Sequence, residues 1–143
     1  MRFLTTIAIM LWIAATVAAA PDVPPIVGEG LEMYQKKRGD DALAVWLKGS
    51  PIENDTATKK QFEGYFTLID KLYGKMLSYE LVRVVPVAPS YERVYLIARH
   101  ERGPVFYVFD CYRSDAGWII PTFELNTRAK EVLPPQILSG TSQ

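Results

Sequence analysis

The sequence contains one cysteine, one histidine and no excess charge of either sign, since 16 Lys and Arg residues balance 16 Asp and Glu residues. A single cysteine, Cys111, excludes an intrachain disulfide. A single histidine, His100, excludes the paired-histidine motifs of metal sites and leaves no recognisable Ser/His/Asp set. The missing basic excess argues against a protein that binds nucleic acid through its charge. We therefore expect no metal, no cofactor and no nucleic-acid partner.

Both of these single residues are interpreted as structural. Cys111 follows Tyr107 and Phe109 at two-residue spacing on a predicted strand, so we expect a small buried hydrophobe rather than a reactive thiol. His100 ends a predicted strand beside the charged segment Arg99–Arg102, so we expect it at the surface.

The first twenty residues have the pattern of an export signal. A cationic start at Arg2 precedes an apolar run and three alanines. We expect a signal peptide over residues 1–19, cleaved after Ala19. Cleavage after Ala20 is the alternative, but it would place Pro21, which lacks a backbone N–H, directly after the scissile bond. The pattern predicts a protein of the periplasm or the cell exterior that contacts the membrane only during export. An uncleaved membrane anchor is the competing interpretation.

The rest of the chain is long enough for one domain with a hydrophobic core and too short for two. We expect an extended leader over residues 20–27, a single domain over residues 28–138 and a flexible tail over residues 139–143. The leader contains the proline-rich segment Pro21–Pro25, which favours an extended conformation.

Two short helices are predicted at the start of the domain. The first covers about residues 30–38 and ends at Gly39. The second covers residues 41–48, with Asp40 as its N-cap.

A long amphipathic helix follows Asn54 and Asp55, either of which can cap it. Its apolar residues recur at the spacing of one helical face. They are Phe62, Tyr65, Phe66, Ile69, Leu72, Tyr73 and Met76.

The second half of the chain changes to the two-residue period of strands. Short turns between the strands favour an antiparallel meander, and Pro121 indicates an edge or bulge position for the last strand. The predicted fold class is α+β, with N-terminal helices packed on a curved four-stranded antiparallel sheet to form a cone-shaped roll. The predicted strands are Tyr79–Ala88, Arg93–His100, Val105–Arg113 and Trp118–Asn126.

The third predicted strand is apolar on both faces. Phe106, Val108 and Tyr112 lie opposite the face that carries Cys111. A sheet covered by helices on one side ordinarily has a polar second face. We therefore expect the second face either to form a homodimer interface through the sheet or to line a cavity.

Three segments of the chain resemble secreted bacterial proteins of the nuclear transport factor 2-like, or cystatin-like, α+β roll. The resemblance spans most of the domain and rests on turn and packing residues rather than a catalytic motif. It implies a cone between helix and sheet that hosts isomerases, dehydratases or binding modules. The segments are Trp46–Pro51; Gly103–Pro104 with Phe106, Phe109, Tyr112 and Arg113; and Trp118 with Phe123, Asn126–Thr127, Ala129, Glu131 and Leu133–Pro134.

Asp110 and Tyr112 are the weak candidates for catalysis. A carboxyl group desolvated among aromatic residues has a raised pKa and can act as a general base, with Tyr112 as hydrogen-bond donor. The resemblance implies a carboxylate and a tyrosine inside the cone, which this pair would match. The alternative is a structural ion pair between Asp110 and Arg83, Arg99 or Arg113.

Aromatic residues of the predicted helices are candidates for a ligand pocket. Trp46 and Tyr65, together with Asp110 and Tyr112, form the predicted binding set for a small apolar ligand. The alternative is that the aromatic stripe is hydrophobic core.

The sequence favours a non-enzymatic binding module for a small apolar ligand or a protein partner. The first alternative is an enzyme of the isomerase or dehydratase kind that uses Asp110 and Tyr112. The second is an envelope-associated scaffold held by the uncleaved Met1–Ala20 segment.

Overall fold

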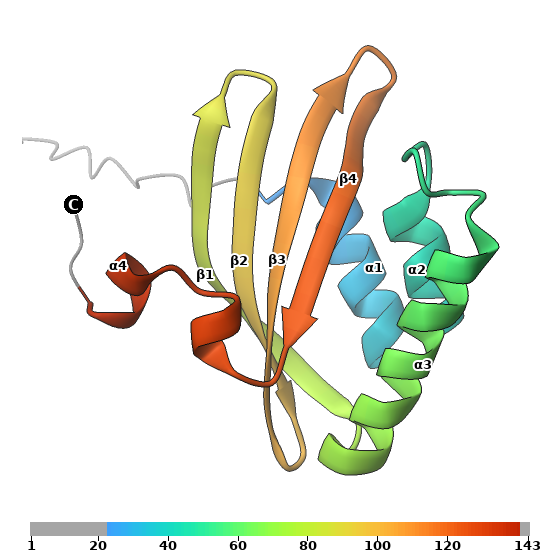
Figure 1. The fold of residues 1–143 in the computed structure, drawn as a ribbon, viewed down its shortest axis with the longest axis vertical. Helices are drawn as coiled ribbons and strands as arrows, with labels where there is room; N and C mark the ends of the chain where they lie inside the picture. Colours follow the sequence, from blue (N-terminus) through green and yellow to red (C-terminus); the bar gives the residue numbers. More distant parts are fainter. Residues whose placement is uncertain (1–22, 141–143) are drawn as a thin grey trace, which may run out of the picture.

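The computed structural model describes residues 23–140 (Figure 1). Three helices precede four strands, and two short helical turns follow them. The helices are α1 (Pro25–Gln35), α2 (Gly39–Leu47) and α3 (Thr56–Tyr73), and the strands are β1 (Met76–Ala88), β2 (Tyr91–His100), β3 (Gly103–Ser114) and β4 (Gly117–Asn126). The chain then forms the 3-10 turn η1 (Ala129–Glu131) and the short helix α4 (Pro135–Leu138). The predicted signal peptide lies outside the described residues.

The four strands form one antiparallel sheet in the order β1-β2-β3-β4, which confirms the predicted α+β meander. Pro121 lies in the edge strand β4, where Ile120 and Pro121 stand opposite the single residue Cys111 in a bulge. The other edge, β1, contains Pro86 and three register shifts of its own. Prolines and bulges at both edges of the sheet disfavour hydrogen bonding of these edge strands to strands of other chains. No helix within residues 23–140 is both long enough and apolar enough to cross a membrane.

Helix α1 begins earlier than predicted, inside the segment assigned to the leader. Pro25 lies in its first turn. The backbone N–H groups of a first turn have no acceptor within the helix, so the N–H that proline lacks removes no hydrogen bond there. Val27, Leu31 and Tyr34 then place one buried face of the helix toward the sheet.

The other two helices follow their predicted positions more closely. Helix α2 begins at Gly39, so Asp40 lies in its first turn rather than at the N-cap. Asp55 caps α3 as predicted, because its carboxylate accepts hydrogen bonds from the backbone N–H groups of Ala57 and Thr58 at 3.0 and 3.1 Å.

Trp46 of α2 lies at the centre of the core and is fully buried. Its ring centroid lies 5.1 Å from that of Phe109 and 5.3 Å from that of Phe123. Its indole N–H donates a hydrogen bond of 3.2 Å to the carbonyl of Val27. The space between helices and sheet, which the roll would use as a cone, is therefore occupied by this side chain and its aromatic neighbours.

The second apolar face of β3 is covered by the C-terminal end of the chain. Tyr95, Val108 and Leu133 form a second buried cluster, against which Phe106 and Ile137 pack. The C-terminal segment therefore accounts for the apolar side chains of Phe106 and Val108, and the homodimer through the sheet stays a prediction. Only Tyr112, at the far end of β3, remains 40 % exposed.

Candidate functional site

The structure does not bring the four predicted ligand-binding residues together. Trp46 is in the core, and Tyr65 lies on α3 with 45 % of its surface exposed. Asp110 and Tyr112 share the sheet face opposite Trp46, because side chains alternate along β3 and Phe109 points into the core. The predicted set is therefore distributed over three parts of the molecule.

Asp110 forms an ion pair with Arg93, its direct cross-strand neighbour on β2. Arg93 donates through Nε and Nη2 to the two carboxylate oxygens at 2.6 and 3.2 Å. This hydrogen bond raises the pKa of the Arg93 guanidinium. The alternative of a structural ion pair at Asp110 is therefore correct, but its partner is Arg93 and none of the three arginines that the sequence suggested. Arg99 instead pairs with Glu80 at 3.6 Å.

His100 is buried, with 5 % of its surface exposed, so the expected surface position is wrong. Its pairing with Met76 places it beneath the end of α3. There Nδ1 donates a hydrogen bond of 2.8 Å to the carbonyl of Gly74, the residue that follows the helix. The histidine therefore satisfies a helix-end carbonyl, which is a structural role.

Two buried tyrosines, Tyr34 and Tyr107, lie near the exposed carboxylate Asp70 of α3. The hydroxyl of Tyr34 donates to Asp70 at 3.0 Å. Burial, together with the charge of Asp70, raises the pKa of both Tyr34 and Tyr107. Cys111 is buried as predicted, and its burial raises the thiol pKa to about 12, which leaves it unreactive at neutral pH.

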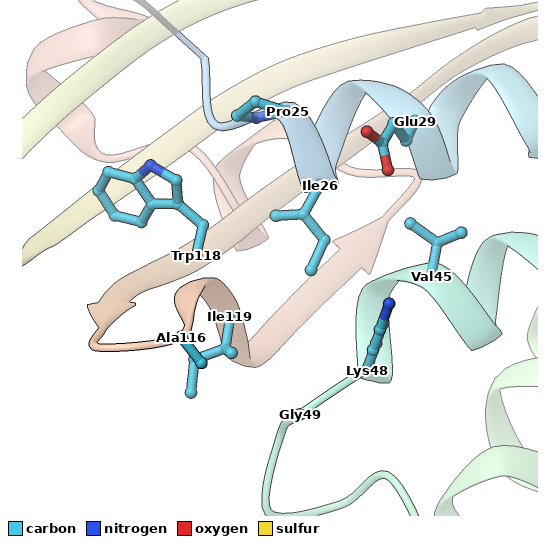
Figure 2. A pocket seen from close by; sticks show the side chains of 9 residues that line it. All are labelled: Pro25, Ile26, Glu29, Val45, Lys48, Gly49, Ala116, Trp118 and Ile119. Atoms are coloured by element: carbon cyan, nitrogen blue, oxygen red, sulfur yellow. The ribbon is translucent and has the colours of Figure 1, made fainter.

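A cleft that the sequence did not predict opens between α1, the end of α2 and the β3–β4 turn (Figure 2). We call it the α1–hairpin cleft. Its volume is about 440 Å³, which lies within the range of small-molecule sites. Its lining consists of Pro25, Ile26, Glu29, Val45, Lys48, Gly49, Ala116, Trp118 and Ile119.

The walls of the α1–hairpin cleft are apolar, and two opposite charges lie at one side. Figure 2 shows Ile26 pointing into the space, with Trp118 on one side and Val45 on the other. Glu29 of α1 and Lys48 at the end of α2 extend toward each other. Within residues 23–140, neither of them has an ion-pair partner within 4.0 Å.

Trp118 is fixed from one side by a cation. The guanidinium carbon of Arg113 lies 4.9 Å from the centre of its ring. This contact holds a half-buried aromatic surface beside the cleft. The sequence predicts only that Trp118 begins a strand and carries part of the family resemblance, because most of its neighbours in the cleft come from two helical segments that lie far away in sequence.

Chemically, the α1–hairpin cleft can bind a ligand through apolar contacts and through one pair of opposite charges. It contains one carboxylate and one amine, and no histidine, cysteine or hydroxyl side chain lines it. The residues that the structure describes include no group of three or more His, Cys, Asp or Glu side chains that could hold a metal ion. No protein-family model, curated protein or solved structure matches this chain.

Proposed function

We propose that this protein is an exported, non-enzymatic binding module and that its ligand is a small, mainly apolar molecule held in the α1–hairpin cleft. The observation that carries the proposal is the cleft itself, a mainly apolar space of about 440 Å³ between α1, the end of α2 and the β3–β4 turn. Glu29 and Lys48 would orient a polar end group of the ligand, while Ile26, Val45 and Trp118 contact its apolar body.

This proposal moves the binding site away from the cone. Trp46 occupies that space and is fully buried, so a ligand there would have to displace a core side chain. The α1–hairpin cleft needs no such rearrangement. The helix-then-meander order and the placement of the helices on one face of the sheet support an evolutionary relation to the nuclear transport factor 2-like roll.

The enzyme alternative receives no support from the geometry. Asp110 lies outside the cone, and both of its oxygens accept hydrogen bonds from Arg93. Tyr112 is 40 % exposed on the same outer face. A general base needs a free oxygen within reach of a bound substrate.

A fluorescent probe tests the cleft. The probe is 8-anilinonaphthalene-1-sulfonate, which combines a flat apolar body with an anionic group that suits Lys48. We expect saturable binding with energy transfer from Trp118, and Lys48→Glu should weaken the affinity about fivefold because it replaces an attraction with a repulsion. Lys36→Glu is the matched control. It makes the same charge change at the C-terminal end of α1, about 15 Å along the helix from the cleft residue Ile26.

The two variants separate binding in the cleft from binding elsewhere. Equal affinity in Lys48→Glu and Lys36→Glu would place the probe at another surface and remove the support for the cleft. Trp46 remains as a second energy donor in Trp118→Phe, so a clear decrease in energy transfer, with the affinity retained, would support a probe position near the Trp118 ring.

Export is tested separately by N-terminal sequencing of the protein recovered from outside the cytoplasm. A product that begins at Ala20 supports a freely released module. A product that begins at Met1 supports the alternative of a scaffold anchored by its N-terminal segment.

A further inference from the structure

The β3–β4 hairpin carries a cation beside the α1–hairpin cleft that the proposed function does not yet use. Arg113 and Trp118 are direct cross-strand neighbours near the closed end of this hairpin, so their side chains lie on the same face of the sheet. The guanidinium carbon of Arg113 lies 4.9 Å from the centre of the Trp118 ring. Stacking on an aromatic ring fixes a guanidinium group and leaves its N–H groups free to donate hydrogen bonds at their edge.

A second hollow adjoins the cleft on the side of this cation. We call it the Arg113 hollow, and its volume is about 440 Å³. It shares Pro25 and Trp118 with the α1–hairpin cleft, and Figure 2 shows these two residues on the side of the cleft opposite Val45. The two spaces are therefore neighbours across an apolar border. The lining of the Arg113 hollow consists of Val23, Pro24, Pro25, Glu92, Arg113 and Trp118.

The guanidinium of Arg113 is available to an anion. Its side chain is exposed, and within residues 23–140 no carboxylate oxygen lies within 4.0 Å of its nitrogen atoms. Glu92 supplies a carboxylate to the same hollow, but Glu92 is half-buried and its Oε1 is shielded from water. A fixed cation at the end of an apolar surface is suited to a ligand that has a negative end group and an apolar body.

We infer, on the basis of the proposed binding function, that the ligand of the α1–hairpin cleft is an amphiphilic carboxylate. Its apolar chain lies in the cleft and crosses the border formed by Pro25 and Trp118, and its carboxylate accepts hydrogen bonds from Arg113. The planar guanidinium can donate to both oxygens of one carboxylate. Because the group is already held against Trp118, binding costs less side-chain freedom than it would for an unrestrained cation.

Lys48 is the competing anchor for the carboxylate, because it is the cation that lines the cleft itself. Figure 2 shows Lys48 extending toward Glu29, so a ligand carboxylate at Lys48 would also approach the negative charge of Glu29. Arg113 has no carboxylate at such close range. The charges therefore favour Arg113 for the carboxylate and leave the side of Glu29 and Lys48 to an uncharged polar group.

Octanoate and 1-octanol test the inference as a matched pair, because they have the same chain length and differ in the charge of the end group. Both are titrated into the purified protein, and binding is followed by the NMR signal of the Trp118 indole N–H. The indole N–H of Trp46, which is buried and bonded to Val27, is the internal reference. Arg113→Gln should weaken the affinity for octanoate about fivefold and leave that for 1-octanol unchanged within about twofold.

Two further variants separate charge from position. Arg113→Lys keeps the charge without the planar guanidinium, so its loss of octanoate affinity should be smaller than that of Arg113→Gln. Arg83→Gln is the matched control, because Arg83 stands opposite Tyr95 on the outer face of the sheet. It should change neither affinity. Arg113 is exposed, so its variants should fold, which the dispersion of their NMR spectra checks.

The possible results distinguish the inference from the proposed function. If neither compound shifts the Trp118 signal, the cleft does not bind small amphiphiles and both are overturned. If 1-octanol binds but Arg113→Gln affects octanoate no more than 1-octanol, the binding function stands and the assignment to a carboxylate at Arg113 is wrong. A selective loss of octanoate binding in Lys48→Gln, with none in Arg113→Gln, would place the carboxylate at Lys48 and overturn the inference as well.

Discussion

Gly30 is where a single added methyl group should cost this domain the most. The residue lies in the middle of α1, where alanine would ordinarily stabilise a helix by about 1 kcal/mol. A Cβ at this position would lie 2.0 Å from Nε1 of Trp46 and within 2.5 Å of two more atoms of that ring. Helix propensity and packing therefore predict opposite effects for Gly30→Ala.

Packing determines whether Gly30→Ala stabilises or destabilises the domain, because the neighbours of the Trp46 indole prevent it from shifting. The ring is fully buried against Phe66, Phe109 and Phe123, and its N–H is bonded to Val27. Overpacking of a core costs about 1–3 kcal/mol, and loss of the indole hydrogen bond adds about 1 kcal/mol. After subtraction of the helix gain, we expect Gly30→Ala to lower the free energy of unfolding by about 2 kcal/mol.

Urea denaturation measures this change, and α3 offers a matched control. Gly64 also lies inside a helix, but a Cβ there meets nothing within 4 Å. Gly64→Ala should therefore raise the free energy of unfolding by 0.5 to about 1 kcal/mol. Similar stabilisation by both substitutions would refute the packing argument. The double variant Gly30→Ala with Trp46→Phe should lose less than the sum of the single losses, since the pyrrole atoms that clash are gone.

Two further predictions concern groups that the sequence did not distinguish. Within residues 23–140, the buried hydroxyl of Tyr107 has no hydrogen-bond partner. Thermal unfolding should therefore show that Tyr107→Phe stabilises the domain by up to about 1 kcal/mol. Tyr34→Phe, which loses the hydrogen bond to Asp70, should destabilise the domain by a similar amount. The hydrogen bonds from Thr58 and Ala57 lower the pKa of Asp55 in the folded state, so its stabilising contribution is present above about pH 4 and is lost as the pH falls through the lowered value. Asp55→Asn keeps the cap and should flatten this part of the pH–stability profile; an unchanged profile would show that other carboxylates cause it.

Elements with a clear period could be predicted from the sequence. The long helix and the four strands appear at their expected places, because hydrophobic periodicity and glycine–proline turns are local signals. The start of α1 differs from the prediction, because the proline-rich segment predicts an extended leader whereas proline is also favoured in a first helical turn, where Pro25 lies.

The candidate site could not be predicted in this way, because long-range contacts decide it. The coverage of Phe106 and Val108 depends on residues 129–137 returning to the sheet, which no local pattern indicates. The ion-pair partner of Asp110 could have been predicted from the sequence, since the short β2–β3 turn fixes the register that places Arg93 opposite Asp110. The burial of His100 required knowledge of where α3 ends relative to β2. The α1–hairpin cleft joins three separate segments and leaves no common signal in the sequence.

The return of residues 129–137 to the outer face of the sheet has a consequence for how the protein is made. Neighbouring strands pair in sequence order, so the hairpins can form as soon as each is synthesised. The segment that covers Tyr95 and Val108, however, follows all four strands in the chain and is therefore synthesised after them. Until this segment packs against the sheet, one face of the sheet stays open to water and to other nascent chains. Residues 129–137 therefore close the outer face of a sheet whose strands are already made.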